Sequence, residues 1–363
     1  MPRERRQSTK ESPIHGGSFA FWLRVVLVVA GIVAFTFRPS PAWVGGPYVN
    51  GIYPIWEHAA AAIASAVPFS LGDSAVLLGV GWLAWRIAIA LRRRTWRASG
   101  ILALDALALA AFYLIWFLVA WGWCYQRAPL QTRLAYHPSA VTTAAAVRLR
   151  TLAIAQINAL APLAHAQAKQ PLNLVALRKA WLPVVQRFGD DWKPHVGAPK
   201  FTLAGPFMVA NGTSGFINPL TLEAQLAPDL FWFERPFDLA HEWTHIAGFA
   251  REDEANYAAV LTCLRSRDVV DRYSGWLELF MYLPPKKHYA ADTFTPLVWS
   301  DFAAIRRRNA RHINLAFARF SWGTYNTYLK SNHVASGIAN YNEVTRLVLG
   351  IPLNRAGLPR VRS

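Results

Sequence analysis

Two histidines four residues apart, with a glutamate directly after the first, are the clearest chemical feature of the chain. They are His241, Glu242 and His245. Positions i and i+4 of a helix lie on one face, so both imidazoles can bind one metal ion. Glu242 then lies where a carboxylate can take a proton from a metal-activated water. This HExxH pattern predicts a Zn²⁺ site for hydrolysis, with Glu242 as the catalytic general base.

A third protein ligand is expected soon after His245, because catalytic zinc usually has three protein ligands and one water. Gly248 can end the first helix, and an acidic segment opens a second one. Glu252 and Glu254 are both candidates, but they point ~200° apart on a helix. We favour Glu252, because Asn256 shares its face and can orient a ligand side chain. The alternative is that these acids bind no metal and only stabilise the positive end of the helix dipole at the N-terminus.

Hydrolysis also needs a group that stabilises the oxyanion of the transition state. Tyr273 and His333 are candidates by residue type alone, and a structural role is the alternative for each. Asp238 lies one turn before His241. We interpret its carboxylate as a group that caps the helix or stabilises the positive end of the helix dipole, in preference to a catalytic role.

The composition is that of a membrane protein. Hydrophobic residues make up 53% of the 363 residues, charged residues only 16%, and there are 16 tryptophans, a residue that collects at membrane interfaces. The net charge of +17 suits contact with anionic lipid, and no nucleic-acid-binding module accompanies it. The two cysteines, Cys124 and Cys263, form no CxxC pair, and we favour two free thiols over a disulfide.

Three apolar runs have the length of membrane spans. They cover residues 19–37, 74–91 and 101–123. A fourth stretch, 53–69, contains Glu57 and His58 and is interpreted as an interfacial or re-entrant helix. The predicted membrane domain is therefore 19–123.

Basic residues predict the orientation of these spans. They concentrate in the N-terminal segment 1–18 and in the loop between the second and third spans, at Arg92, Arg93, Arg94 and Arg97. Both regions are expected in the cytoplasm of a multi-pass inner-membrane protein. Residues 124–363 then form an extracytoplasmic domain on the periplasmic side. If 53–69 crosses the membrane fully, the metal site moves to the cytoplasmic side.

The domain after the spans reads as mostly helical. Residues 139–168 and 172–188 have the pattern of core-packing helices. Between residues 200 and 226, short apolar runs alternate with turn residues, which predicts small strands and a hairpin. Such a strand can border the cleft of the metal site and pair with an extended substrate, or it can be an ordinary structural hairpin.

Four segments resemble one family. The run HEWTHIAGFAREDEANYAAVLTC is similar to the core motif of a bacterial membrane family catalogued as domain of unknown function 3810. The segments beginning at Trp121, Gly215 and Ser336 resemble its WGLNYxR, GxxNPxTGEA and GxxSY stretches, with Cys124, Leu222 and Asn340 as departures. The spacing ExxAN from Glu252 also resembles the ExxAD of membrane-associated gluzincin peptidases.

The resemblance implies a mainly α protein. Three N-terminal transmembrane helices would precede a zincin-like, mostly helical domain with a small β-hairpin. The leading hypothesis is a membrane-anchored zinc metallopeptidase that hydrolyses peptides or envelope proteins with a zinc-activated water. The alternatives are a non-catalytic zinc-binding envelope scaffold and a zinc hydrolase of a non-peptide amide. The intact Glu242 favours an enzyme, because a structural zinc site has no need of it.

Overall fold

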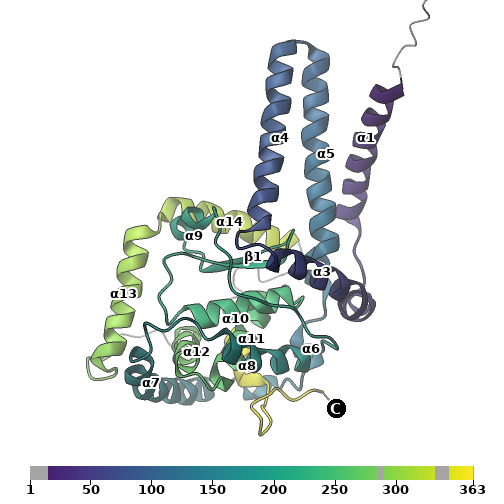
Figure 1. The fold of residues 1–363 in the computed structure, drawn as a ribbon. Helices are drawn as coiled ribbons and strands as arrows, with labels where there is room; N and C mark the ends of the chain where they lie inside the picture. The colour runs from purple at the N-terminus through teal and green to yellow at the C-terminus, as the bar shows by residue number, and fades with distance from the viewer. Residues whose placement is uncertain (1–14, 285–288, 332–342, 363) are drawn as a thin grey trace, which may run out of the picture. The chain divides into compact units, whose positions relative to one another are not determined.

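The computed structural model describes residues 15–284, 289–331 and 343–362. The chain divides into two compact units. Unit 1 consists of Met1–Phe37 and Val76–Val119, and unit 2 of Arg38–Ala75 and Ala120–Ser363. Almost all of the regular structure is helical, with one two-stranded antiparallel sheet in the described part of the chain (Figure 1).

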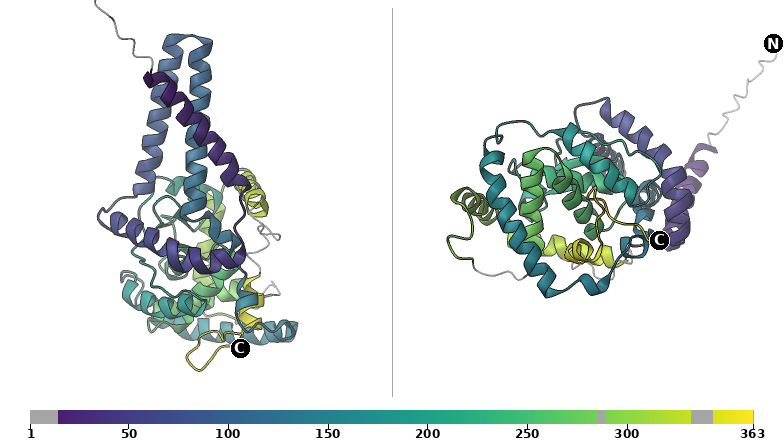
Figure 2. Two further views of the ribbon diagram at one scale, coloured as in Figure 1. Left: turned by 90° about the vertical axis from the view of Figure 1, so that its right-hand side faces the viewer. Right: turned by 90° about the horizontal axis from the view of Figure 1, so that it is seen from below.

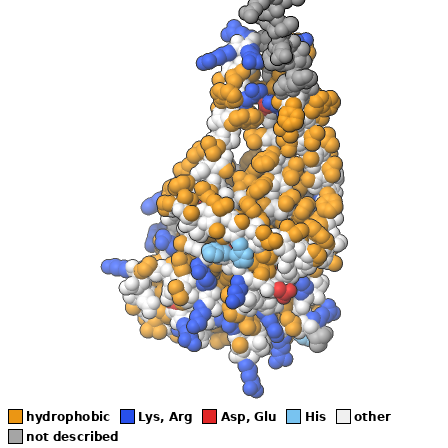
Figure 3. Space-filling model, turned by 45° about the vertical axis from the view of Figure 1, so that its right-hand side comes forward, with side chains coloured by type: hydrophobic (Ala, Val, Ile, Leu, Met, Phe, Trp, Pro, Cys, Tyr) orange, Lys and Arg blue, Asp and Glu red, His pale blue; other side chains and the backbone are white. Residues whose placement is uncertain are grey.

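Unit 1 contains the apolar helices. They are α1 (His15–Thr36), most of α4 (Leu71–Arg93) and most of α5 (Trp96–Ala120). All three are long and apolar enough to cross a membrane, which confirms the three predicted segments. The candidate spans are only 6%, 6% and 17% buried within the structure, so most of their side chains are available to lipid. Figure 3 shows hydrophobic side chains covering their visible face.

One carboxylate links the three apolar helices. Asp105 on α5 is almost fully buried and pairs with Arg24 on α1 at 2.5 Å and with Arg86 on α4 at 2.5 Å. An unpaired charge in hydrocarbon is costly, and this pairing relieves that cost for all three groups. Arg24 also donates to the Ala20 carbonyl at 2.6 Å, so its guanidinium group is held within unit 1.

Unit 2 begins with a helical segment that the sequence analysis assigned to the membrane domain. It contains α2 (Pro41–Trp43), a π-helix (Val44–Ile52) and α3 (Tyr53–Ser65). The Glu57 side chain on α3 is fully buried and accepts a hydrogen bond of 2.7 Å from the His195 backbone N–H. Tyr53 donates 2.7 Å to the Ile246 carbonyl. These polar contacts, all within unit 2, explain why an alanine-rich helix carries a glutamate.

The rest of unit 2 is a set of helices around α11. The elements are η2 (Gly122–Gln126), α6 (Leu130–Arg133), η3 (Pro138–Ala140), α7 (Thr143–His165), α8 (Leu174–Arg187), α9 (Gly205–Asn211), α10 (Arg235–Ile246), α11 (Glu252–Arg265), α12 (Val269–Tyr282), α13 (Pro296–His312), α14 (Leu315–Ser331) and α15 (Val344–Gly350). Helix α11 packs against α8, α10, α12 and α15, and α7 lies along α12 (Figure 2). Every residue from Glu252 to Cys263 is buried, so α11 is the centre of the core.

The predicted core helices and hairpin are confirmed with one correction. Helices α7 and α8 lie within the predicted ranges, and the side chains of Thr142 and Asn173, each directly before the first helical residue, cap them. The sheet pairs β1 (Gly215–Asn218) with β2 (Glu223–Leu226), in register from Gly215 opposite Leu226 to Asn218 opposite Glu223. Residues 205–211, predicted as part of a strand region, instead form helix α9. Its proline lies in the first turn, where proline is compatible with a helix.

Candidate metal centre

Helices α10 and α11 are joined by a tight turn at Gly248. Its φ of +83° is a left-handed conformation that favours glycine. The Gly248 N–H donates 3.0 Å to the His245 carbonyl, and the Phe249 N–H donates 3.2 Å to the Thr244 carbonyl. This is the hydrogen-bond pattern of a Schellman motif, which ends a helix and reverses the chain. The predicted helix, glycine turn and second helix are therefore present.

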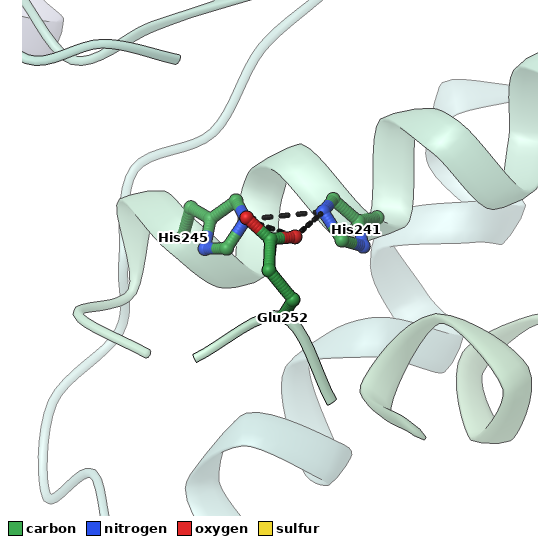
Figure 4. Close-up of side chains that lie close together, drawn as sticks. All are labelled: His241, His245 and Glu252. Carbon is green, nitrogen blue, oxygen red and sulfur yellow. Dashed lines mark hydrogen bonds and ion pairs between the residues drawn. The ribbon is translucent and has the colours of Figure 1, made fainter. Parts of the chain in front are cut away.

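The turn brings Glu252 against the two histidines of α10. The Nε2 atoms of His241 and His245 are 3.0 Å apart. Glu252 Oε2 lies 3.2 Å from His241 Nε2 and 3.6 Å from His245 Nε2. Figure 4 shows the three side chains converging on one point. Within the described residues, this is the one group of three or more His, Cys, Asp or Glu that can hold a metal ion.

Both histidine rings are held at Nδ1 by oxygen acceptors. His241 Nδ1 is 2.8 Å from Asn256 Oδ1, and His245 Nδ1 is 2.7 Å from the Phe249 carbonyl oxygen. An oxygen acceptor places the proton on Nδ1, so in a neutral ring the Nε2 lone pair is free. Two Nε2 lone pairs and the Glu252 carboxylate then face one another. Three acceptors this close need a proton or a metal cation between them.

The spacing of these atoms suits zinc. Ligand atoms about 2.0–2.1 Å from a zinc ion at tetrahedral angles lie roughly 3.3–3.4 Å from one another. The three distances in the structure are 3.0, 3.2 and 3.6 Å. Two imidazoles and one carboxylate also leave a fourth position open, as in catalytic sites. The donor set, its spacing and the hydrogen bonds at Nδ1 all fit this metal.

The electrostatics of the cluster favour a cation. Burial opposes charge on His245, but the Glu252 carboxylate outweighs burial and raises the pKa of His245 to about 9. Burial favours the neutral acid at Glu252, yet His245 and the hydrogen bonds from both rings hold its pKa well below the usual range. Burial lowers the pKa of His241. Glu252 is thus an anion among imidazole nitrogens, which is the environment that a divalent ion needs.

Glu242 lies next to this cluster without a partner for one of its oxygens. The residue is 3% exposed, and its Oε2 atom has no hydrogen-bond partner among the described residues. Burial raises the pKa of this carboxyl group to about 8. A Cβ atom on Gly215 would lie 2.6 Å from Glu242 Oε1, so the start of β1 packs directly on the carboxyl group. The close approach explains glycine at the first position of β1.

The other candidate residues predicted from the sequence do not join the three ligands, or lie outside the residues that the structure describes. Glu254 accepts a hydrogen bond of 2.8 Å from the Leu130 N–H and is turned away from the histidines. The Tyr273 hydroxyl donates 2.5 Å to Asp301 and does not line the cavity at the metal cluster. His333 lies outside the described residues. Asp238 is in the first turn of α10, as expected, but its side chain also borders the cavity.

A cavity of about 620 Å³ opens on the metal cluster. Its wall includes His241, Glu242, His245 and Glu252 together with β1 from Gly215 to Ile217. Further lining comes from residues far apart in the sequence, among them Trp121, Glu234, Phe237, Glu278, Tyr282 and Arg308. Sequence patterns missed most of these, because residues on different helices meet only through tertiary packing.

Comparison with known proteins identifies the family. A family model described as "Protein of unknown function (DUF3810)" matches residues 48–349. The chain belongs to the DUF3810 family. A search of curated proteins and of solved structures found no match. The part of the chain that resembles the DUF3810 motifs contains the whole metal cluster.

One DUF3810 motif supports the C-terminal end of α10. Trp121 donates through Nε1 to the His245 carbonyl at 2.8 Å, and Arg127 donates to the Gly248 carbonyl at 3.4 Å. The last carbonyl groups of a helix have no partner within the helix. The tryptophan therefore adds a second donor to the His245 carbonyl, and the arginine donates to the carbonyl of the glycine turn, so both fix the backbone beside the second histidine.

A second DUF3810 motif forms the β1–β2 turn. Asn218 Oδ1 accepts a hydrogen bond of 3.0 Å from the Leu220 N–H, a side-chain contact that is typical of turns. Leu222 has a φ of +52°, a left-handed conformation. Glycine adopts this conformation without the steric cost that leucine has here. Glu223 accepts hydrogen bonds from the N–H groups of Leu71 and Gly72 at the start of α4.

Proposed function

We propose that the protein is a membrane-anchored zinc metallopeptidase with His241, His245 and Glu252 as ligands and Glu242 as general base. The single observation that carries the proposal is the arrangement of these four residues at one cavity. Three converge at 3.0–3.6 Å, and the fourth presents a buried oxygen without a partner. A buried carboxylate without a partner is costly, and such groups are common where a reaction needs them.

Zinc at this cluster would supply Lewis acidity and would lower the pKa of a water molecule. Glu242 takes the proton of the attacking water and later delivers it to the amine of the leaving group. Its pKa of about 8 in the metal-free chain is raised by burial, and a neighbouring cation lowers it. Asn256 and the Phe249 carbonyl keep the histidine rings in the ligand orientation.

The proposed substrate is a peptide in extended conformation. Strand β1 lines the cavity from Gly215 to Ile217 and pairs with β2 on one side. The Lys200 bridge lies on the other edge of β2, so within the described residues no strand pairs with the outer edge of β1. An extended backbone can add to such an edge by hydrogen bonding. This favours a peptide over a compact amide, and it supports a zincin-like domain.

We further propose that the catalytic unit is extracytoplasmic. Three spans and the arginines at 92, 93, 94 and 97, which are all exposed, support this orientation in the inner membrane. A non-catalytic zinc scaffold and a zinc hydrolase of a non-peptide amide are the competing functions. The unpartnered Glu242 oxygen favours an enzyme over a scaffold.

The test compares the envelope proteins of cells that carry wild type or Glu242→Gln. Gln has nearly the same shape but cannot accept the proton, so the variant is expected to retain zinc and to accumulate an uncleaved envelope protein. Purified wild type should then cleave that protein, and the variant should not. Identical envelope proteomes with zinc bound to both chains would contradict the peptidase proposal and favour the scaffold.

A further inference from the structure

We propose that Asp238 and Glu278 form an acidic subsite that binds a lysine or arginine side chain of the peptide substrate beside the scissile bond. The inference rests on the proposed peptidase function and adds the class of side chain that the enzyme selects. Asp238 lies on α10, one turn before His241, and Glu278 lies on α12. Both line the same 620 Å³ cavity as Glu242.

Charge balance in this cavity points to a cationic ligand. Five carboxylates line it, from Glu234, Asp238, Glu242, Glu252 and Glu278. Arg308, the one lysine or arginine in the lining, is ion-paired with Glu234. Glu252 would serve the metal and Glu242 the reaction. The charge of Arg308 also acts on Asp238 and Glu278, but one guanidinium group faces three acids here, so an excess of negative charge remains.

The neighbours of the two carboxylates offset their charge only in part, because Arg308 is shared with Glu234. Asp238 interacts with the Ser214 hydroxyl, which carries no charge. No hydrogen bond to Glu278 occurs within the described residues. Burial, together with the nearby Asp238 carboxylate, raises the pKa of Glu278 well above its usual range. Both residues are half-buried, and two neighbouring acids that repel each other are stabilised by a cation between them.

A second observation supports a ligand site here. The Oε2 atom of Glu242, a residue only 3% exposed, has no partner and borders the same cavity. A buried oxygen without a partner at the wall of a cavity indicates that a bound ligand or water supplies the missing hydrogen bond. The walls also suit a long basic side chain, because Phe237 and Tyr282 line the cavity with ring centroids 6.3 Å apart. Lysine and arginine place their methylene stems on apolar surface while the charged end reaches acceptors.

A second metal ion is not the favoured cation. Among the residues described, the metal-capable group is His241, His245 and Glu252, and neither Asp238 nor Glu278 belongs to it. Two carboxylates without a third ligand suit an ammonium or guanidinium group, which needs hydrogen-bond acceptors and not a coordination shell.

The test measures peptide binding to the zinc-loaded full chain in detergent, in the Glu242→Gln background so that no peptide is consumed. The probes are fluorescent acetyl pentapeptide amides that differ only at the central residue, which is lysine, norleucine or glutamate. Lysine is expected to bind at least about tenfold more tightly than norleucine, as for a charge-assisted hydrogen bond in a desolvated site. Glutamate is expected to bind most weakly.

The double substitution Asp238→Asn and Glu278→Gln keeps side-chain shape and removes both charges. It is expected to reduce the ratio between lysine and norleucine peptides to within about twofold, by the same reasoning. Glu343→Gln, which removes a partly exposed carboxylate at the start of α15, serves as the control and should keep the full ratio. Zinc content and thermal unfolding of each variant show whether it is folded.

Equal binding of lysine and norleucine peptides to a zinc-loaded chain would overturn the subsite and leave the peptidase proposal standing. Retention of the lysine preference in the double variant would also overturn it. Failure of the wild-type chain to bind zinc would instead contradict the proposed function on which the subsite rests.

Discussion

At the scale of single residues, the candidate metal centre depends on the hydrogen bonds that orient its two histidine rings. Asn256 accepts from His241 Nδ1 at 2.8 Å, and the Phe249 carbonyl does the same for His245 at 2.7 Å. These contacts select the tautomer that leaves both Nε2 atoms free to bind a metal. The carbonyl partner belongs to the backbone of the glycine turn, so side-chain substitution cannot remove it directly. Asn256 is therefore the partner to test.

We predict that Asn256→Ala weakens zinc binding by roughly 10–100-fold, the usual cost of removing such a partner. Competitive titration of the purified chain against a chromophoric zinc chelator measures this. Asn158→Ala is the matched control, because Asn158 also forms two hydrogen bonds, but to the backbone at Thr293 and Thr295. An equal loss of affinity in both variants would mean that the effect is general destabilisation.

At the scale of elements, β1 and α10 are packed so closely that one added methyl group would overlap with a neighbouring side chain. A Cβ on Gly215 would lie 2.6 Å from Glu242 Oε1. We predict that Gly215→Ala lowers the free energy of unfolding by about 1–3 kcal/mol, as overpacking of a core does. Chemical denaturation in detergent measures it. A Cβ on Gly323 meets nothing within 4 Å in α14, so Gly323→Ala should be neutral or stabilising by up to ~1 kcal/mol. Equal effects would contradict the close packing.

Helix α3 provides a pH-dependent contribution to stability. Burial raises the pKa of Glu57 to about 8. The folded chain therefore binds more protons than the unfolded chain between the ordinary glutamate pKa and about 8, and stability falls as pH rises through this window.

Glu57→Gln keeps an oxygen acceptor for the His195 N–H and removes the titration. We predict that wild type loses roughly 2–4 kcal/mol more than the variant between pH 5 and pH 8, from the size of the shift. Unfolding curves of both chains at the two pH values provide the comparison. Parallel pH profiles would show that Glu57 is not buried as described.

The elements differ in how far the sequence predicts them. Spans of the right length and the i, i+4 spacing of His241 and His245 are local patterns, and the glycine turn also has a local signal. The same spacing places Asn256 on the face of Glu252. By contrast, the hydrogen bond of Trp121 to the His245 carbonyl joins residues 124 positions apart, and nothing in either segment alone predicts it. Helix α9 was missed because Gly205 and Pro206 at its start, and Gly212 directly after it, resemble turn residues.

At the scale of the whole molecule, the chain combines a three-helix unit with a helical unit that contains the candidate metal ligands. The proposed orientation can be tested with cysteine labelling, because Cys124 and Cys263 are both buried free thiols. Gln170 and Arg97 are exposed in the structure. We predict that Gln170→Cys reacts with an impermeant maleimide in intact spheroplasts, and that Arg97→Cys reacts only after lysis. The opposite pattern would place the catalytic unit in the cytoplasm.

The most direct test of the account is the zinc content of the purified chain, measured by mass spectrometry of the metal against protein concentration. Wild type should contain one zinc per chain. The single variants His245→Ala and Glu252→Gln should lose it, whereas Glu254→Gln, which alters an acid turned away from the histidines, should keep it. A wild-type chain that binds no zinc, or a His245→Ala variant that retains the full amount, would contradict the proposed metal centre.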